Sequence, residues 1–127
     1  MSLRIEIDRN AAGAERTARI HLAGRLDTVT SAQLEKELDP MLDGRLDSLI
    51  FDLAGLEFIS SAGIRVLVHA RKSIQAQHGG VLMVNAQPQI VKVFEIIKAL
   101  PGLTVFESEA ELDQYLAEMQ RRVQEGR

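Results

Sequence analysis

Two adjacent serines at a predicted helix start are the residues whose types and spacing best fit a chemical role. Ser60 and Ser61 follow a predicted buried strand, and Ala62 and Gly63 come directly after them. A helix start offers free N–H donors and the positive end of the helix dipole, so it favours a negative charge placed there. The structural alternative is that one hydroxyl caps the helix by accepting a backbone N–H bond. Gly63 either leaves room for an approaching partner or serves packing alone.

A carboxylate in a second loop completes the candidate site. Asp27 ends the turn of residues 24–27, which follows one predicted strand and precedes a helix. If that strand and the strand before Ser60 are parallel neighbours, both loops emerge at the same end of the sheet, and Asp27 faces Ser61. The structural alternative for Asp27 is a carboxylate that binds the N–H groups of the helix it precedes.

Enzymatic chemistry at these serines has little support. The Gly-x-Ser-x-Gly elbow of serine hydrolases is absent, because Ile59 stands two residues before Ser61. His69 lies further along the same predicted helix, roughly 12 Å from Ser61 at 1.5 Å per residue, too far to act as its base. His21 in a strand and His78 at a helix end have ordinary structural explanations. We therefore expect no catalytic residues.

Metal and cofactor sites are equally unsupported. The chain has no cysteine, which excludes thiolate ligands, cysteine nucleophiles and disulfides. No group of histidines and carboxylates has the spacing of a metal site, and no glycine-rich phosphate loop is present. We expect no metal and no cofactor.

Length, charge and composition narrow the class of protein further. The 127 residues suit one domain, and 46% hydrophobic with 26% charged residues is ordinary globular composition. The net charge of −3, without a basic run, gives no support for a nucleic-acid partner. Charged residues interrupt the first residues, and no later stretch reaches about 18 apolar residues, so we expect no signal peptide, no membrane association and a cytoplasmic location.

Hydrophobic periodicity predicts how the sheet and helices are ordered. Residues 3–8 and 18–24 alternate with a period of two and predict an antiparallel pair with the first strand at an edge. Helices and strands then alternate: a helix over 30–42, a strand over 48–53 of the kind covered on both faces, a helix over 61–79, a strand over 81–84, a helix over 88–100, a strand over 103–106 and a helix over 108–123. The predicted fold class is α/β, with a mixed sheet (an N-terminal antiparallel pair, then parallel strands) and helices packed on it.

Local signals predict where the helices begin and end. Thr30 with Gln33 has the spacing of a capping box, and so has Ser108 with Glu111. Pro40 should bend or end the first helix. The last helix combines an apolar stripe, typical of a core face, with charges typical of a solvated face. A membrane role for it is a minor alternative.

Three segments in this order resemble the STAS domain family, which includes bacterial anti-sigma factor antagonists and the cytosolic tails of sulfate transporters. They are residues 22–27, residues 51–53 leading into 56–63, and the helix over 94–100 followed by residues 103–106. The resemblance covers nearly the whole chain and implies a single STAS-like domain over residues 1–127. It also implies that Ser61 matches the serine phosphorylated by an anti-sigma factor serine kinase, and that Asp27 lies beside it. In the family, the unphosphorylated form binds that kinase and releases the sigma factor.

One departure from the family pattern concerns the serines themselves. The antagonists often have Asp-Ser-Ser-Gly or Asp-Ser-Thr-Gly, whereas here Ser60 replaces the acid and Ala62 replaces the second hydroxyl. Ser60 therefore competes with Ser61 as phosphoacceptor. The resemblance implies that Asp27, Ser60, Ala62 and Gly63 contact the partner.

These observations favour a binding protein without enzymatic activity. We expect an anti-sigma factor antagonist switched by phosphorylation at Ser61, for which the kinase partner supplies ATP. The alternative is a constitutive scaffold or accessory subunit of a stress-signalling or transport complex, in which the serine loop binds without being modified. A small serine hydrolase is a third, formal competitor.

Overall fold

A computed structural model describes residues 3–9, 16–99 and 108–126 and places the predicted elements in the predicted order. The strands are β1 (Leu3–Arg9), β2 (Thr17–Leu26), β3 (Ser48–Ile59) and β4 (Gly80–Val84), and the helices are α1 (Thr28–Asp43), α2 (Ser61–Ala76), α3 (Pro88–Ala99) and α4 (Glu109–Gln124). The predicted strand over 103–106 lies outside the described residues.

The four strands form one mixed sheet in the order β1-β2-β3-β4. β1 pairs antiparallel with β2, whereas β2 with β3 and β3 with β4 are parallel. This confirms the predicted antiparallel pair followed by parallel strands, with β1 at an edge.

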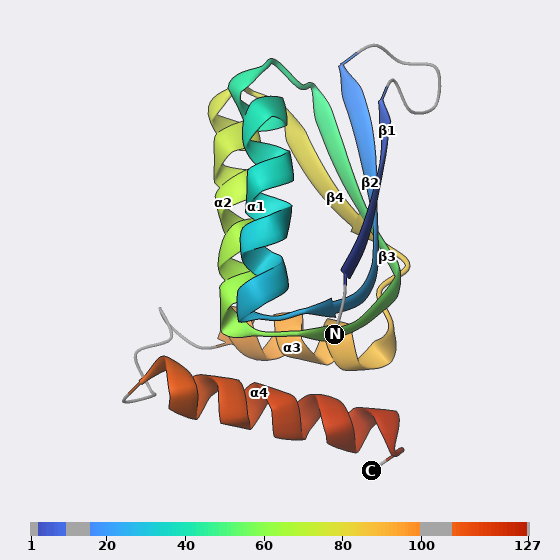
Figure 1. Ribbon diagram of the computed structural model, residues 1–127, viewed down its shortest axis with the longest axis vertical. Helices are drawn as coiled ribbons and strands as arrows, with labels where there is room; N and C mark the ends of the chain where they lie inside the picture. Colours follow the sequence, from blue (N-terminus) through green and yellow to red (C-terminus); the bar gives the residue numbers. More distant parts are fainter. Residues whose placement is uncertain (1–2, 10–15, 100–107, 127) are drawn as a thin grey trace.

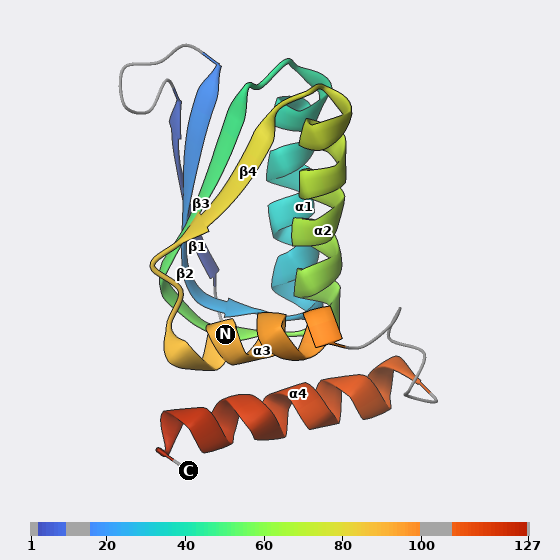
Figure 2. The same cartoon turned by 180° about the vertical axis from the view of Figure 1, so that it is seen from behind.

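Helices α1 and α2 lie on the same face of this sheet (Figure 1, Figure 2). α1 joins β2 to β3 and α2 joins β3 to β4, so the two crossovers step in the same direction along the sheet. Because such crossovers are right-handed, they place both helices on one side. The prediction that β3 is covered on both faces is therefore wrong. Leu49 and Phe51 are fully buried on the helix side, whereas Asp52 lies on the other face and binds Arg19.

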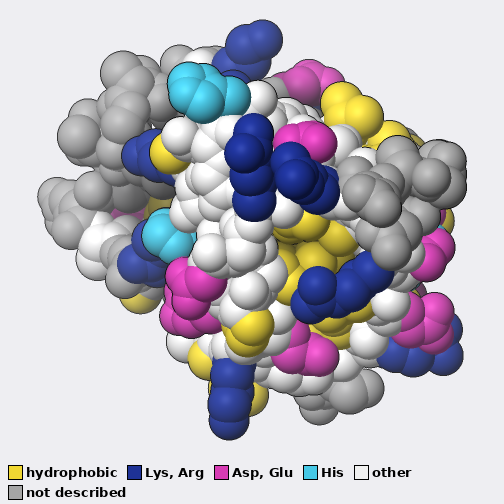
Figure 3. Space-filling view, turned by 90° about the horizontal axis from the view of Figure 1, so that it is seen from above, with side chains coloured by type: hydrophobic (Ala, Val, Ile, Leu, Met, Phe, Trp, Pro, Cys, Tyr) yellow, Lys and Arg dark blue, Asp and Glu magenta, His cyan; other side chains and the backbone are white. Residues whose placement is uncertain are grey.

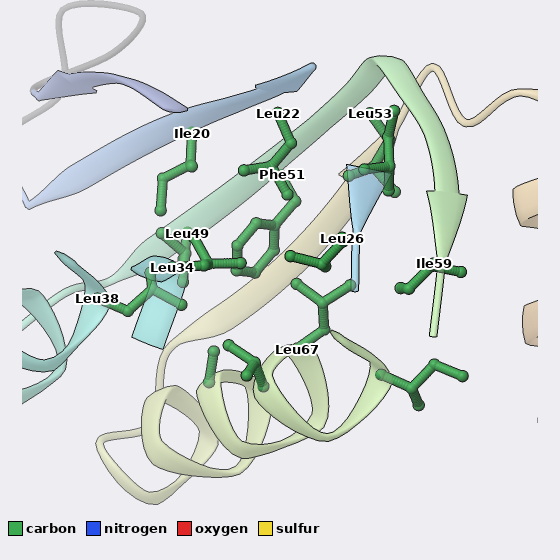
Figure 4. Close-up of a cluster of buried hydrophobic side chains, with 14 of the residues drawn as sticks. Ile20, Leu22, Leu26, Leu34, Leu38, Leu49, Phe51, Leu53, Ile59 and Leu67 are labelled. Atoms are coloured by element: carbon green, nitrogen blue, oxygen red, sulfur yellow. The ribbon is translucent and has the colours of Figure 1, made fainter. Parts of the chain in front are cut away.

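The core between the sheet and the helices is aliphatic around a single aromatic ring (Figure 4). Phe51 lies at its centre, among Ile20 and Leu22 of β2 and Leu49 of β3. The helices contribute Leu34, Leu38 and Leu67, which are 0%, 1% and 0% exposed.

The boundaries of α1 differ from those predicted. Its N-cap is Asp27, and Thr30 is the third residue of the helix, so the predicted Thr30–Gln33 capping box is wrong by three residues. Pro40 lies inside the helix, which continues to Asp43, so the proline does not end it. At α4 the predicted N-cap is confirmed, because the Ser108 hydroxyl accepts a bond from the Glu111 N–H.

α3 and α4 lie across the end of the sheet at which β2 and β3 finish (Figure 1, Figure 2). Figure 3 looks onto the opposite end of the molecule, where acidic and basic side chains are interspersed. Neither sign forms a continuous patch on the part of this face that the structure describes.

Two neighbouring residues of α2 test the packing on the sheet. Leu67 is 0% exposed and Val68 is 38% exposed. We expect Leu67→Ala to lower the free energy of unfolding by about 2–5 kcal/mol, because it leaves a cavity in the core. Val68→Ala should change it by less than about 0.5 kcal/mol. Urea unfolding of both variants measures the difference, and equal losses would contradict the orientation of α2.

Candidate functional site

The ends of β2 and β3 bring the two predicted loops together. The strands are parallel neighbours whose last pair is Leu26 with Ile59, and the Ser60 N–H donates to the Leu26 carbonyl at 2.9 Å. The Arg25 guanidinium also lies 4.0 Å from the centre of the Phe58 ring. α1 and α2 therefore begin side by side at the same end of the sheet, as the sequence predicts for Asp27 and the serines.

The Asp27 side chain caps the start of α1. Its Oδ1 accepts bonds from the N–H groups of Val29 at 3.1 Å and Thr30 at 3.0 Å, and from the Thr30 hydroxyl at 3.1 Å. The Thr30 hydroxyl oxygen in turn accepts from the Asp27 N–H at 2.8 Å. The Thr30 N–H bond is the main reason why the pKa of Asp27 lies below its usual value. The capping alternative therefore describes Asp27 in this structure, and its contact with a partner stays a prediction.

The two serines have different roles at the start of α2. Ser60 is the N-cap, and its hydroxyl accepts a bond from the Gly63 N–H at 3.3 Å. Ser61 is the first residue of the helix. Both side chains are buried, at 5% exposure each, but the Ser61 Oγ has no hydrogen-bond partner among the described residues. The Ser60 hydroxyl is therefore structural, whereas the Ser61 hydroxyl bonds to none of the described residues.

α4 covers this helix start, which sequence reasoning missed. The Ser61 N–H donates to Oδ1 of Asp113 at 2.8 Å. The side-chain amide of Gln120 binds Ile59 twice: it accepts from the Ile59 N–H at 2.9 Å and donates to the Ile59 carbonyl at 2.8 Å. These partners are 52 and 61 residues apart in the sequence. The only sequence signal is a glutamine four residues beyond Leu116 on the buried stripe of α4, where an apolar side chain is expected.

The prediction of free donors at this helix start is therefore wrong for Ser61. Its N–H is held by the Asp113 carboxylate, and the Gly63 N–H is held by the Ser60 hydroxyl. A phosphate on Ser61 would compete with Asp113 for the same donor.

Gly63 and Ala62 occupy different surroundings. A Cβ on Gly63 would lie 2.7 Å from Leu26 Cγ and 2.9 Å from Ile59 Cγ1, so this glycine allows α2 to pack closely against the ends of β2 and β3. Ala62 is half-buried and lines a groove of about 300 Å³ that also includes Thr28 and Arg65. Packing accounts for Gly63, and the partner contacts of both residues stay predictions.

A second polar cluster lies on the sheet face opposite α1 and α2. The Asp52 carboxylate accepts a bond from Arg19 at 2.8 Å and from the Asn85 side chain at 3.2 Å, and His21 Nδ1 lies 3.4 Å from it. The Arg19 bond is the largest reason why the pKa of Asp52 lies below its usual value. No three of the described histidines and carboxylates are grouped as a metal site would require. No helix in the described parts of the chain is long and apolar enough to cross a bilayer.

Comparison with known proteins identifies the family. The family model of the STAS domain matches residues 8–112. This chain belongs to the STAS domain family. The STAS domain described here is 33% identical to BtrV of Bordetella bronchiseptica, named as an anti-sigma factor antagonist, over 59% of this chain and 65% of BtrV, slightly less than two thirds of its length. It is 28% identical to the anti-sigma F factor antagonist of Lysinibacillus sphaericus, over 62% of this chain and 68% of that protein.

The fold of this STAS domain is also that of a solved antagonist. The unphosphorylated form of the anti-sigma factor antagonist SpoIIAA superposes with a TM-score of 0.64 at 21% identity, over 76% of this chain and 81% of SpoIIAA. Its phosphorylated form gives a TM-score of 0.60 at 22% identity, over 76% and 83%. At these identities the likeness concerns the fold alone.

Two substitutions of Asp27 distinguish its role as a helix cap from the effect of its charge. Asp27→Ala should lower the free energy of unfolding by about 1 kcal/mol, because two N–H groups of α1 lose their acceptor. Asp27→Asn should lose far less, since asparagine also caps well. Because the folded pKa of Asp27 is lowered, its stabilisation is present above about pH 4 and is lost as the pH falls through the folded pKa. Urea unfolding from pH 3 to 7 measures these effects, and equal losses for both variants would contradict the capping role.

The two serines should respond differently to the same substitution. We expect Ser60→Ala to cost about 0.5–2 kcal/mol, because it removes the N-cap of α2. Ser61→Ala should leave the stability unchanged or raise it slightly, because it removes a buried hydroxyl that makes no hydrogen bond to the described parts of the chain. Thermal melts and urea unfolding of both variants check this order. A larger loss at Ser61 would mean that its hydroxyl has a structural partner.

Proposed function

We propose that this STAS domain is an anti-sigma factor antagonist switched by phosphorylation at Ser61. The unmodified form binds an anti-sigma factor serine kinase and so frees the sigma factor. The phosphorylated form is released. The names of the two sequence relatives support this function, and the family resemblance supports Ser61 as the acceptor. We expect the switch to operate in the cytoplasm, where the kinase and its ATP are found.

The observation that carries this proposal is the difference between the two serine hydroxyls. The Ser60 hydroxyl caps α2, whereas the Ser61 hydroxyl makes no hydrogen bond within the described chain. Modification of Ser60 would cost the helix its cap. The Ser61 hydroxyl itself makes no hydrogen bond to the described residues that modification would remove. A buried polar group without a partner among the described residues points to a role outside folding.

The chemistry of the switch is a phosphoryl transfer that the partner catalyses. The Ser61 Oγ attacks the γ-phosphorus of ATP bound to the kinase, the new Oγ–P bond forms, and the bond to the β,γ-bridging oxygen breaks. ADP leaves, and the hydroxyl proton passes to a base on the kinase. The STAS domain supplies the acceptor and its position, and it supplies no catalytic group.

The direction of the switch follows from the cost of burying charge. Phosphorylation adds a charge of about −1.5 to −2 at neutral pH. In a complex shaped for a neutral hydroxyl, an unpaired charge taken out of water costs on the order of several kcal/mol. Each 1.4 kcal/mol is about tenfold in affinity, so the partner is lost on phosphorylation.

A constitutive scaffold is the second candidate, and one observation favours it. Ser61 is only 5% exposed, as an unmodified residue would be. A serine hydrolase loses support, because the Ser61 Oγ has no hydrogen-bond partner in the described chain, and so none that could act as its base.

Phosphate analysis and titration separate these functions. Mass spectrometry of the protein from its own cells should find phosphate on Ser61, and the labelling should survive Ser60→Ala but not Ser61→Ala. The kinase that co-purifies should bind the phosphorylated form at least about 100-fold more weakly than the unmodified form. Absence of phosphate with equal affinities would establish the scaffold. Phosphate on Ser60 alone would overturn the assignment of the acceptor.

A further inference from the structure

α4 binds the backbone at the start of α2, where Ser61 would be modified. Asp113 of α4 accepts the bond from the Ser61 N–H at 2.8 Å, and Gln120 binds both backbone groups of Ile59. Beneath these contacts Ser61 is 5% exposed. A kinase must bring phosphorus to within about 3–3.5 Å of the Ser61 Oγ before transfer. The conformation described here does not admit that approach.

We propose that α4 is a displaceable cover over Ser61, and that a phosphate on Ser61 holds it off. In the closed state, Asp113 binds the start of α2 and the hydroxyl is out of reach. In the open state, α4 has detached from the start of α2 while the other elements stay folded, and Ser61 is accessible. The cover rests on the contacts above, and its regulatory meaning rests on the proposed phosphoswitch.

The composition of the α4 interface indicates that α4 can detach without unfolding of the whole domain. Of the 16 residues of α4, the described core includes only Leu112 and Leu116, at 4% and 0% exposure. The third buried residue of the stripe is the polar Gln120, at 1% exposure. By contrast, α2 buries five apolar side chains along its length: Ile64, Val66, Leu67, Ala70 and Ile74. An element held by few apolar contacts is one that opens below the global unfolding free energy.

Charge explains why a phosphate and the closed cover exclude each other. The Ser61 N–H can serve one acceptor at full strength, and it now serves the Asp113 carboxylate. A phosphate on the same residue would present its oxygens to the start of α2 and place like charge against Asp113. Either Asp113 or the phosphate is bound there, and a covalently attached phosphate does not leave. The cover therefore opens.

Three consecutive backbone amides of the unmodified protein test the cover. The Ile59 and Ser61 N–H groups are bound by side chains of α4, whereas the Ser60 N–H between them is bound by the Leu26 carbonyl of the sheet. We expect Ile59 and Ser61 to exchange with solvent deuterium at least about tenfold faster than Ser60 after correction for intrinsic rates. Equal protection of all three amides would overturn the proposal, because α4 would then open only with the whole fold.

A variant pair shows whether one motion exposes both amides. Leu116→Ala weakens α4 without touching either hydrogen-bonding side chain, so it should speed exchange at Ile59 and Ser61 by the same factor, at least about tenfold. The exposed Gln114→Ala is the matched control on the same helix and should change neither rate. Unequal factors at the two amides would overturn the single cover. Should Leu116→Ala fail to fold, the exchange pattern of the unmodified protein decides alone.

The effect of the phosphate is measured on protein carrying phosphoserine at position 61, incorporated during translation. Exchange at Ile59 should rise at least about tenfold, and that at Ser60 should stay within about twofold of the unmodified protein. Unchanged or slower exchange at Ile59 would overturn the displacement of α4. None of these readouts needs the kinase, so absence of phosphate on Ser61 in cells removes the proposed function and leaves the cover standing. Phosphate on Ser61 in cells together with equal exchange at all three amides would support the proposed function and overturn the cover.

Discussion

The pairing of β2 with β3 is the constraint on which the rest of this site depends. Because the strands are parallel and end together at Leu26 and Ile59, the helices that follow them must begin at one end of the sheet. The bond from the Ser60 N–H to the Leu26 carbonyl continues that pairing one residue beyond the strands. It fixes the turn from which α2 starts, so that Asp27 and Ser60 each cap a helix within the same small region. A different register would separate the two loops.

The elements of the fold could be predicted from the sequence because they depend on local periodicity. The alternation in β1 and β2 and the stripes of the helices each lie within a short window. The start of α1 was mispredicted because two capping signals overlap: Asp27 and Thr30 bind each other, and the carboxylate accepts two N–H groups. The one-sided cover of β3 depends on the direction of two crossovers. Periodicity within a strand carries no information about that direction.

The candidate site was predicted only in part, for the same reason. Sequence reasoning brought Asp27 and the serines together because each follows a strand that ends at the same edge. It could not assign the cap between Ser60 and Ser61, since the two differ by one residue in register. It also missed the carboxylate of Asp113, which arrives from α4 over 52 residues of chain. This long-range carboxylate lies at the same helix end as Ser60, where the pattern that the resemblance implies has an acid.

The start of α2 therefore links the docking of α4 to the state of one hydroxyl. A hydrogen bond to a charged group contributes about 1.5–3 kcal/mol, so loss of the contact between Asp113 and the Ser61 N–H is a substantial fraction of what holds a helix with two buried leucines. Moving an equilibrium from 1:99 to 99:1 takes about 5.5 kcal/mol. Loss of this bond and repulsion between a phosphate and Asp113 both act in the direction of opening. The carboxylate is thus needed twice, to close the cover when Ser61 is unmodified and to open it when Ser61 is charged.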